Sequence, residues 1–276
     1  MSPASTSGPL RLAVFGHPVE HSRSPGIHAR FAASLGLEVD YRAVDCPSGG
    51  LAEALARFRD AGGQGCNLTV PLKAEGLALA ALASKAAQQA GACNTLTLHE
   101  DGWRADNTDG AGLVADLDRL GLDIGGARLL LVGAGGAAAG VLGALIERGP
   151  ARIGIVNRSP EPAERLAARV RDAGIPVEVF DFEGGLTAGG FECAIQCTSL
   201  GHQRQAPMLD REWLVADAVA YDLNYGPAHA PFAHWCALKR VRCFGGWGML
   251  VEQAALAFER FTGRRPETKS FYDEPA

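Results

Sequence analysis

The chain has 276 residues, enough for two domains of ordinary size, and 47% of them are apolar. The formal net charge is −5, and acidic and basic residues are interspersed. This balance argues against nucleic acid or a membrane surface as a partner, because both attract basic patches. The sequence has no apolar run of about 18 residues, as a membrane span needs. Residues 1–9 do not resemble a signal peptide, so we expect a cytoplasmic protein.

Seven cysteines occur in the chain, and none forms a Cys-x-x-Cys pair. Cys193 and Cys197 are four residues apart, but no second pair of metal ligands lies near them in the sequence. Zinc sites and disulfide frameworks need paired spacings, whereas isolated cysteines are commonly small buried hydrophobic residues. We therefore expect buried, reduced thiols and no bound metal, which fits a reducing cytosol.

Strands and helices are expected to alternate in the first hundred residues. Apolar runs and helical spacing predict strands at residues 12–15, 39–44 and 68–70, and helices at residues 27–35 and 51–58. Pro71 suits the first position of a further helix, where its missing N–H costs nothing. Such alternation is typical of a parallel sheet. A hairpin at residues 95–98 and 103–105 closes the region.

The pattern restarts after Asp109, which places a domain boundary there. A helix is predicted at residues 110–120, followed by buried strands at residues 128–132, 153–156, 193–196 and 218–223. Near the C-terminus, residues 249–261 are predicted to form an amphipathic helix with Leu250, Ala254, Ala257, Phe258 and Phe261 on its apolar stripe. Two stretches rich in turn-forming residues are predicted as loops, at 183–190 and 201–207.

A glycine-rich stretch follows the strand at residues 128–132 and reads Gly133-Ala134-Gly135-Gly136-Ala137-Ala138. It meets the pattern Gly-x-Gly-x-x-Gly/Ala between a strand and a helix predicted at residues 137–148. The first glycine allows a tight turn, the second lets a pyrophosphate approach the backbone, and the helix N-terminus offers free N–H groups. Glycine also marks plain turns, but the flanking elements favour a dinucleotide site.

The end of the next predicted strand bears on the choice of cofactor. Sites that take NAD usually place Asp or Glu there to bind the ribose 2′-hydroxyl. Here the strand is followed by Asn157-Arg158-Ser159, without an acidic residue. Arg158 can pair with a 2′-phosphate and stack on adenine, so the sequence predicts NADP. The alternative is that Arg158 is a solvated surface residue.

Polar residues gather at four places in the first region. Ser22 and Ser24 precede a predicted helix, where they could donate to a carboxylate or cap the helix. Alternation along a strand would put Asn67 and Thr69 on one face. Lys73 follows at the carboxyl end of that strand, where open sheets bind ligands, although a single lysine is commonly solvent-exposed.

The remaining candidates lie at the domain boundary and in the last helix. Asn94 stands at a strand entrance, and Asp109 follows Asn107-Thr108 in a segment that could be a simple turn. Gln253 interrupts the apolar stripe of the helix predicted at residues 249–261. A buried glutamine needs hydrogen-bond partners, which either the core or a ligand supplies.

Taken together and in order, these motifs resemble the shikimate dehydrogenase family over nearly the whole chain. The resemblance is carried by Asn67-x-Thr69-Val70-Pro71-x-Lys73, Asn94-Thr95, Asn107-Thr108-Asp109-Gly110, Gly133-Ala134-Gly135-Gly136-Ala137, Asn157-Arg158-Ser159 and Gly248-Met249-Leu250-x-x-Gln253. Two further stretches also fit, Ser22-x-Ser24-Pro25 and Tyr221-Asp222-x-x-Tyr225.

The resemblance implies a two-domain α/β fold. An N-terminal α/β substrate-binding and catalytic domain, at residues 1–108 and 247–276, has a mostly parallel sheet completed by the C-terminal helix. A Rossmann domain at residues 109–246 binds NADP. The implied activity is the reversible NADPH-dependent reduction of 3-dehydroshikimate to shikimate, in the biosynthesis of chorismate and aromatic amino acids. The expected assembly is a monomer or homodimer.

The resemblance also implies roles for individual residues. Lys73 and Asp109 correspond to the catalytic pair of the family, and a protonated Lys73 would donate to the ketone. The implied substrate ligands are Ser22 and Ser24 for the carboxylate, Asn67, Thr69, Asn94 and Gln253 for ring hydroxyls, and Tyr225 at the border of the substrate. The implied cofactor ligands are Gly133, Ala134, Gly135, Gly136, Ala137, Asn157, Arg158, Ser159, Thr198, Gly246 and Met249.

Three positions depart from the family pattern. Arginine is common in the family where this chain has Ala139 and Pro162, which implies a weaker clamp on the 2′-phosphate. The aspartate commonly found before Gly-x-Gly-Met-Leu is Gly245 in this chain, and the sequence offers no physical account of that change.

Two other functions fit the same pattern. The first is a quinate/shikimate dehydrogenase with broader use of NAD and NADP, although within the resemblance the pair Ser22 and Ser24 favours shikimate. The second is a non-catalytic dinucleotide sensor on the same fold, against which the presence of both Lys73 and Asp109 argues. Turnover of shikimate and quinate with each cofactor separates the three.

Overall fold

The computed structural model describes residues 8–180, 190–207 and 209–272. Contacts divide this part of the chain into two compact units. Unit 1 contains the described residues up to Thr108 together with Gln253–Ser270, and unit 2 contains Asp109–Glu252 with Phe271 and Tyr272. Of the loop predicted at residues 183–190, all but Gly190 lies outside the described residues. Among the described helices, none combines the length and the apolar character needed to cross a bilayer.

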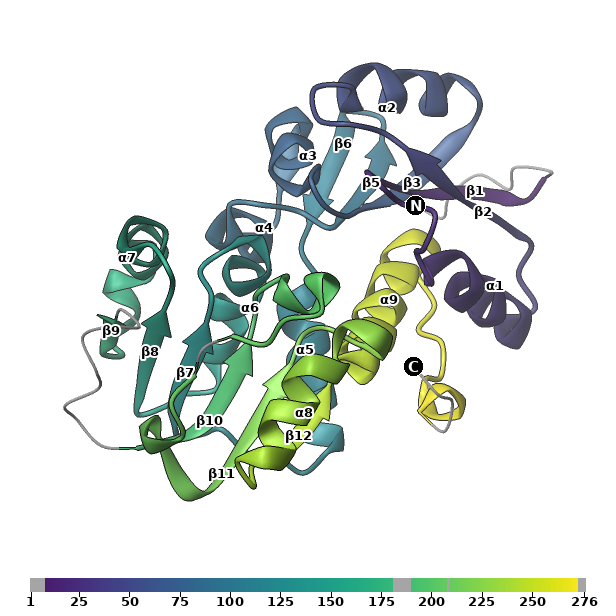
Figure 1. Ribbon diagram of the computed structural model, residues 1–276. Helices are drawn as coiled ribbons and strands as arrows, with labels where there is room; N and C mark the ends of the chain where they lie inside the picture. Colours follow the sequence, from purple (N-terminus) through teal and green to yellow (C-terminus); the bar gives the residue numbers. More distant parts are fainter. Residues whose placement is uncertain (1–7, 181–189, 208, 273–276) are drawn as a thin grey trace. The chain divides into compact units, whose positions relative to one another are not determined.

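Unit 1 is built on a six-stranded sheet with the strand order β2-β1-β3-β5-β6-β4 (Figure 1). β1 is parallel to β2 and β3, and β4 is parallel to β6, whereas β5 is antiparallel to β3 and β6. The expected mostly parallel sheet is confirmed. The elements are β1 (Leu10–Gly16), α1 (Ser24–Leu35), β2 (Val39–Asp45), α2 (Leu51–Asp60), β3 (Gly63–Leu68), α3 (Lys73–Leu79), β4 (Leu82–Ala83), α4 (Lys85–Ala90), β5 (Thr95–His99) and β6 (Gly102–Asp106).

The strand predicted at residues 68–70 is wrong, because β3 ends at Leu68. Thr69 lies beyond the strand, in a turn in which the Leu72 N–H donates to the Thr69 carbonyl oxygen at 2.8 Å. Asn67 and Thr69 therefore do not share one face of a strand. α3 begins at Lys73, so Pro71 precedes the helix and does not occupy its first position.

The position of β3 depends on glycines that the apolar pattern does not detect. A Cβ atom at Gly63 would overlap the ring of Phe58, and one at Gly65 would overlap the ring of Phe261. The two rings cover the backbone of β3, so burial here is supplied by side chains outside the strand, one of them, Phe261, distant in the sequence. A strand can therefore form without the β-branched side chains that mark most strands.

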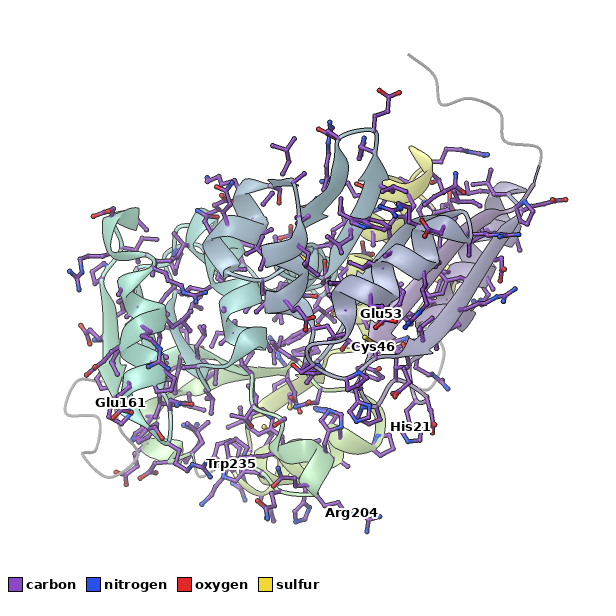
Figure 2. All side chains as sticks on the ribbon, turned by 90° about the horizontal axis from the view of Figure 1, so that it is seen from above. His21, Cys46, Glu53, Glu161, Arg204 and Trp235 are labelled. Carbon is purple, nitrogen blue, oxygen red and sulfur yellow. The ribbon has the colours of Figure 1, made fainter. Side chains whose placement is uncertain are left out.

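Unit 1 is completed by the C-terminal part of α9 (Trp247–Thr262), from Gln253 onward. This part of α9 lies beside α1 (Figure 1), where Phe31 packs edge-on against Phe258 with ring centroids 5.8 Å apart. A second cluster of buried residues includes Phe15, Leu51 and Cys46. Figure 2 shows Cys46 close to α2, the helix that carries Glu53.

Unit 2 is a six-stranded, all-parallel sheet with the order β12-β11-β10-β7-β8-β9. This is the order of a Rossmann domain, in which the chain changes direction between the first and fourth strands, here β7 and β10. The elements are α5 (Asp109–Arg119), β7 (Arg128–Val132), α6 (Gly136–Glu147), β8 (Arg152–Val156), α7 (Pro160–Ala168), β9 (Val177–Phe180), β10 (Phe191–Gln196), β11 (Leu214–Asp222), α8 (Ala230–Leu238) and β12 (Arg242–Gly245).

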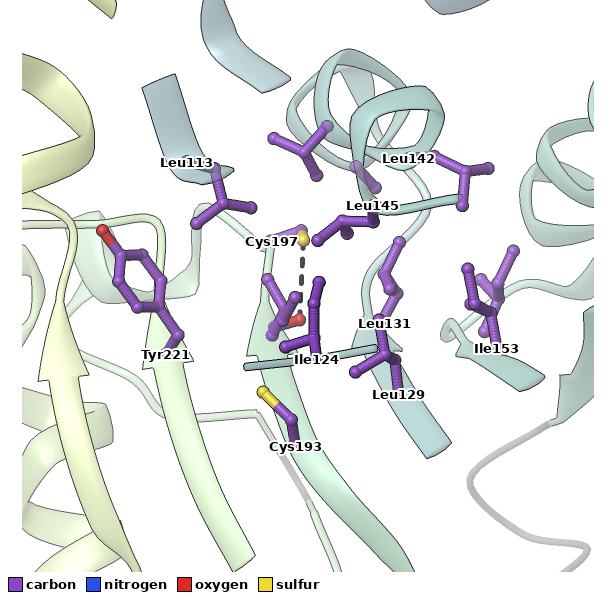
Figure 3. Close-up of a cluster of buried hydrophobic side chains, with 14 of the residues drawn as sticks. Leu113, Ile124, Leu129, Leu131, Leu142, Leu145, Ile153, Cys193, Cys197 and Tyr221 are labelled. Atoms are coloured by element: carbon purple, nitrogen blue, oxygen red, sulfur yellow. Dashed lines mark hydrogen bonds between the residues drawn. The ribbon is translucent and has the colours of Figure 1, made fainter. Parts of the chain in front are cut away.

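The largest hydrophobic cluster of unit 2 lies between its sheet and the helices α5 and α6 (Figure 3). Leu129 and Leu131 of β7, Leu142 and Leu145 of α6, and Leu113 of α5 are all fully buried in it. Cys193 and Cys197 belong to the same cluster, which confirms the expectation that they are small buried hydrophobic residues. The cluster fixes β7 against α6, and so holds the loop that joins them.

Candidate functional site

The glycine-rich loop of unit 2 lies at the point where the strand order reverses. Gly133 follows β7 with φ of +104°, a conformation that side chains other than glycine rarely adopt. A Cβ atom there would lie 2.8 Å from Cγ2 of Thr198, which follows β10. The loops after β7 and β10 are therefore in contact at the switch point, where doubly wound sheets bind ligands.

The next two glycines have no structural explanation within the described residues. A Cβ atom on Gly135 or Gly136 would meet no heavy atom within 4 Å, and neither residue has a positive φ. Both are exposed at the start of α6, whose N-cap, Gly135, makes no side-chain capping bond. An open, glycine-lined helix N-terminus fits a pyrophosphate, which binds to free backbone N–H groups.

Asn157 connects the glycine-rich loop to the end of β8. Its Oδ1 accepts a hydrogen bond from the Ala134 N–H at 3.1 Å, and its Nδ2 donates to the Ser159 carbonyl oxygen at 2.8 Å. Arg158, which lies between Asn157 and Ser159 in the sequence, is exposed and makes no hydrogen bond or ion pair with any described residue. Its guanidinium is therefore available for a phosphate group.

Two glycines near the start of α9 are required by close approaches within unit 2. A Cβ atom at Gly246 would overlap the carbonyl oxygen of Leu223. One at Gly248 would overlap the carboxylate of Asp116, a fully buried group that accepts from the Tyr221 hydroxyl at 2.6 Å and pairs with Arg119 at 2.7 Å. Part of the Gly-x-Gly-Met-Leu motif is thus explained by packing.

Gly245, the departure left unexplained by the sequence, makes room for a histidine. A Cβ atom at Gly245 would lie 3.0 Å from Cδ2 of His229. The His229 Nδ1 is 2.9 Å from Oδ2 of Asp222, which is fully buried. The hydrogen bond to Asp222 raises the pKa of His229 above its usual value. The imidazole occupies space that a side chain at position 245 would need.

Unit 1 contains a polar cluster centred on Asn94, which is buried. Its Nδ2 donates to Thr108 Oγ1 at 2.8 Å and to Gln253 Oε1 at 3.1 Å. Its Oδ1 accepts from the Thr108 N–H and from Thr95 Oγ1, both at 2.9 Å. Gln253 interrupts the apolar stripe because it meets this cluster, so protein groups supply at least part of its hydrogen bonding.

Asn67 of β3 joins this cluster from the neighbouring strand. Its Nδ2 donates to the Asn94 carbonyl oxygen at 3.0 Å and to Thr95 Oγ1 at 3.1 Å. Its Oδ1 accepts from the Tyr41 hydroxyl at 2.8 Å. Three of the residues expected to bind ring hydroxyls, Asn67, Asn94 and Gln253, are therefore in one hydrogen-bonded group.

The serines stand at the start of α1, whose N-cap is Arg23 and has no side-chain capping bond. Ser22 Oγ accepts the N–H of Ser24 at 3.3 Å. Both serines are half-buried, as is Lys73 at the first position of α3.

In unit 2, Asp109 is buried at the first position of α5. The ring centroids of Tyr225 and Trp247 are 5.9 Å apart.

Sequence reasoning missed Tyr41 and Asp116. Asp116 stands three residues after Leu113 and one before Leu117, both buried on α5, so it interrupts an apolar stripe as Gln253 does. A polar residue on an apolar helix stripe is therefore the signal that identifies Asp116, as it does Gln253. Tyr41 gave no comparable signal, because its importance depends on the pairing of β2 with β1 and of β1 with β3.

Comparison with known proteins identifies the family. Family models match three segments: residues 14–96 match the shikimate dehydrogenase substrate binding domain, 117–187 match shikimate / quinate 5-dehydrogenase, and 246–274 match the shikimate 5'-dehydrogenase C-terminal domain. A Xanthomonas oryzae protein named shikimate dehydrogenase (NADP(+)) is 45% identical over 266 residues, which cover 95% of this chain and 94% of that protein.

Solved structures agree in fold. Thermus thermophilus shikimate 5-dehydrogenase, solved in complex with NADP(H) and shikimate, has a TM-score of 0.83 at 36% identity and covers 95% of this chain and 97% of that one. A 5-ketofructose reductase from Gluconobacter has a TM-score of 0.86 at 26% identity, covering 96% and 97%. The extent and identity of the sequence match decide between such relatives: this chain belongs to the shikimate dehydrogenase family.

Proposed function

We propose that this chain is an NADP-dependent shikimate dehydrogenase that reversibly reduces 3-dehydroshikimate to shikimate in the biosynthesis of chorismate and aromatic amino acids. The observation that carries the proposal is the polar cluster of unit 1, in which Asn67, Asn94 and Gln253 are held together by hydrogen bonds. A site built to bond hydroxyl groups rejects compounds that lack them. Such a cluster suits a polyhydroxylated ring.

The residues of unit 2 fit the dinucleotide that this reaction needs. Gly133, Ala134, Gly135, Gly136 and Ala137 would hold the pyrophosphate, and Asn157, Arg158 and Ser159 the 2′-phosphate end, with further contacts from Thr198, Gly246 and Met249. The fit is supported by the open space at Gly135 and Gly136 and by the exposed Arg158. When bound, NADPH supplies the hydride.

Proton transfer is assigned to Lys73, with Asp109 as its partner. In the reducing direction, the protonated Nζ of Lys73 donates to the ketone oxygen, and in the oxidising direction the neutral amine accepts the hydroxyl proton. Asp109 orients the amine and accepts a hydrogen bond from a neighbouring ring hydroxyl. Ser22 and Ser24 donate to the substrate carboxylate, Asn67, Thr69, Asn94 and Gln253 bind ring hydroxyls, and Tyr225 borders the substrate.

The proposed domains are a substrate-binding domain at residues 1–108 and 247–276 and an NADP-binding domain at residues 109–246. The proposed location is the cytoplasm, and the proposed assembly is a monomer or homodimer, which sedimentation of the purified protein distinguishes.

Absorbance of the reduced nicotinamide tests the proposal directly. The purified protein is mixed with shikimate or quinate and with NADP or NAD, which gives four combinations. We expect the highest kcat/KM with shikimate and NADP. Equal activity on quinate would instead indicate a quinate/shikimate dehydrogenase. Dinucleotide binding without turnover of either compound would indicate a sensor and contradict the proposal.

A further inference from the structure

Tyr41 lies on β2 between an aromatic cluster and the polar cluster of unit 1. Its ring stacks on the imidazole of His28, with centroids 4.1 Å apart and planes at 18°. His28 is itself 1% exposed and packs against the rings of Phe31, Phe258 and Phe261. The ring of Tyr41 is therefore fixed by its aromatic surroundings, which fixes the position of its hydroxyl.

The Tyr41 hydroxyl reaches a residue of the proposed substrate site. It donates to Asn67 Oδ1 at 2.8 Å. Tyr41 belongs to β2 and Asn67 to β3, and these two strands lie on either side of β1, so the phenol connects two strands that do not pair with each other.

The hydrogen bonds of the Asn67 side chain leave one acceptor position on Oδ1 unused. Its Nδ2 uses both protons, on the Asn94 carbonyl oxygen and on Thr95 Oγ1. Its Oδ1 has two lone pairs, of which Tyr41 occupies one. The remaining capacity of the amide is a single acceptor position, which suits the O–H of a ligand. If the amide flipped, it would present N–H donors to Tyr41 and lose its other bonds.

We infer that Tyr41 is a positioning residue, whose hydroxyl holds the Asn67 amide with its oxygen ready to accept from a substrate hydroxyl. The inference rests on the proposed function for the identity of the ligand. It does not make Tyr41 a catalytic residue, because Tyr41 acts through Asn67.

The substitution Tyr41→Phe removes the hydroxyl and keeps the ring that stacks on His28. The loss of one hydrogen bond that orders the site corresponds to an increase of about three- to tenfold in KM for shikimate. We expect kcat and the KM for NADP to stay within about twofold of the parent values. A merely structural role would lower thermal stability and leave the KM for shikimate unchanged.

Tyr221→Phe is the matched control. Tyr221 is a fully buried tyrosine of unit 2 whose hydroxyl donates to the buried Asp116 at 2.6 Å. This variant also loses a buried hydroxyl, so we expect it to lower the unfolding temperature without raising the KM for shikimate. An equal rise in KM in both variants would overturn the inference.

A double-substitution cycle tests the route of the effect. If Tyr41 acts mainly through Asn67, Tyr41→Phe should change the KM for shikimate less than about twofold when Asn67→Ala is already present. Full additivity of the two substitutions would overturn the inference, because independent residues add.

A readout without substrate separates this inference from the proposed function. The Asn67 side-chain amide protons, followed by nitrogen-15 NMR, should exchange slowly in the parent and measurably faster in Tyr41→Phe. If the parent neither binds nor oxidises shikimate, the proposed function fails, and the amide signals alone then decide whether Tyr41 holds Asn67. Unchanged amide exchange in Tyr41→Phe would overturn the inference in either case.

Discussion

The two units build their candidate binding surfaces from different parts of the polypeptide. In unit 1 the surface consists of side chains that bond to one another, such as Asn67, Asn94 and Gln253. In unit 2 it consists largely of backbone, exposed where Gly135 and Gly136 lack side chains. Function in unit 1 is therefore lost by removing atoms, and function in unit 2 by adding them.

The largest expected effect comes from truncating one side chain in unit 1. Lys73→Ala should lower kcat by about 10²- to 10⁴-fold, the usual contribution of a general acid or base, with a modest change in the KM for shikimate. Steady-state kinetics in both directions measure it. Lys85→Ala, at an exposed lysine that begins α4, is the control and should leave kcat within about twofold. A Lys73→Ala variant with nearly parental kcat would remove Lys73 as the proton donor.

Gly→Ala substitutions in the glycine-rich loop of unit 2 should separate effects on stability from effects on NADP binding. Gly133→Ala forces a side chain into a positive φ and against Thr198, so we expect a loss of about 1–3 kcal/mol in stability from backbone strain alone. Gly135→Ala meets open space and should leave the unfolding temperature unchanged while weakening NADP binding. Thermal unfolding and calorimetric titration with NADP measure the two effects. Equal NADP affinity in Gly135→Ala and the parent would contradict the assignment of this loop.

Arg158 is an exception in unit 2, because it contributes a side chain to a candidate binding surface that otherwise consists largely of backbone. Arg158→Ala should weaken NADP binding by about 1.5–3 kcal/mol, the scale of a hydrogen bond to a charged group. Binding of NAD, which lacks the 2′-phosphate, serves as the internal control and should not change. If NADP and NAD lose affinity equally, Arg158 does not bind the phosphate.

The same difference decides what could be predicted from the sequence. The strands β7, β8 and β10 were predicted nearly in full, because continuous apolar runs between two helical layers define them without reference to neighbours. β3 was misplaced because Phe58 and Phe261 supply its burial at Gly63 and Gly65.

The candidate site divides in the same way. The glycine-rich loop is a local motif, so its neighbours in the sequence suffice to predict its position between β7 and α6. The Asn94 cluster joins residues 159 positions apart, and the role of Tyr41 depends on strand register. The polar residues of unit 1 could be nominated from the sequence, but only the fold shows which of them bond to each other.

The last expected effect concerns two histidines whose environments differ between the units. Burial lowers the pKa of His28, in unit 1, to about 3, whereas the bond to Asp222 raises the pKa of His229, in unit 2. Below pH 6.5 His28 is protonated in the unfolded chain but stays neutral in the folded protein, so unit 1 loses stability as pH falls. For His229 the sign is opposite: its contribution is complete below pH 6.5 and is lost as pH rises through its folded pKa.

Acidification should therefore affect the units differently, and hydrogen exchange can follow each one separately. Between about pH 7 and about pH 5, His28 should cost unit 1 about 2 kcal/mol, since each pKa unit is worth about 1.4 kcal/mol. His28→Phe, which keeps an aromatic ring against Tyr41, should reduce the loss measured at β1 amides and leave β11 amides unaffected. His229→Gln should change the pH dependence at β11 alone. An acid response at β1 that is the same in His28→Phe and the parent would show that His28 is not the group that unit 1 keeps uncharged.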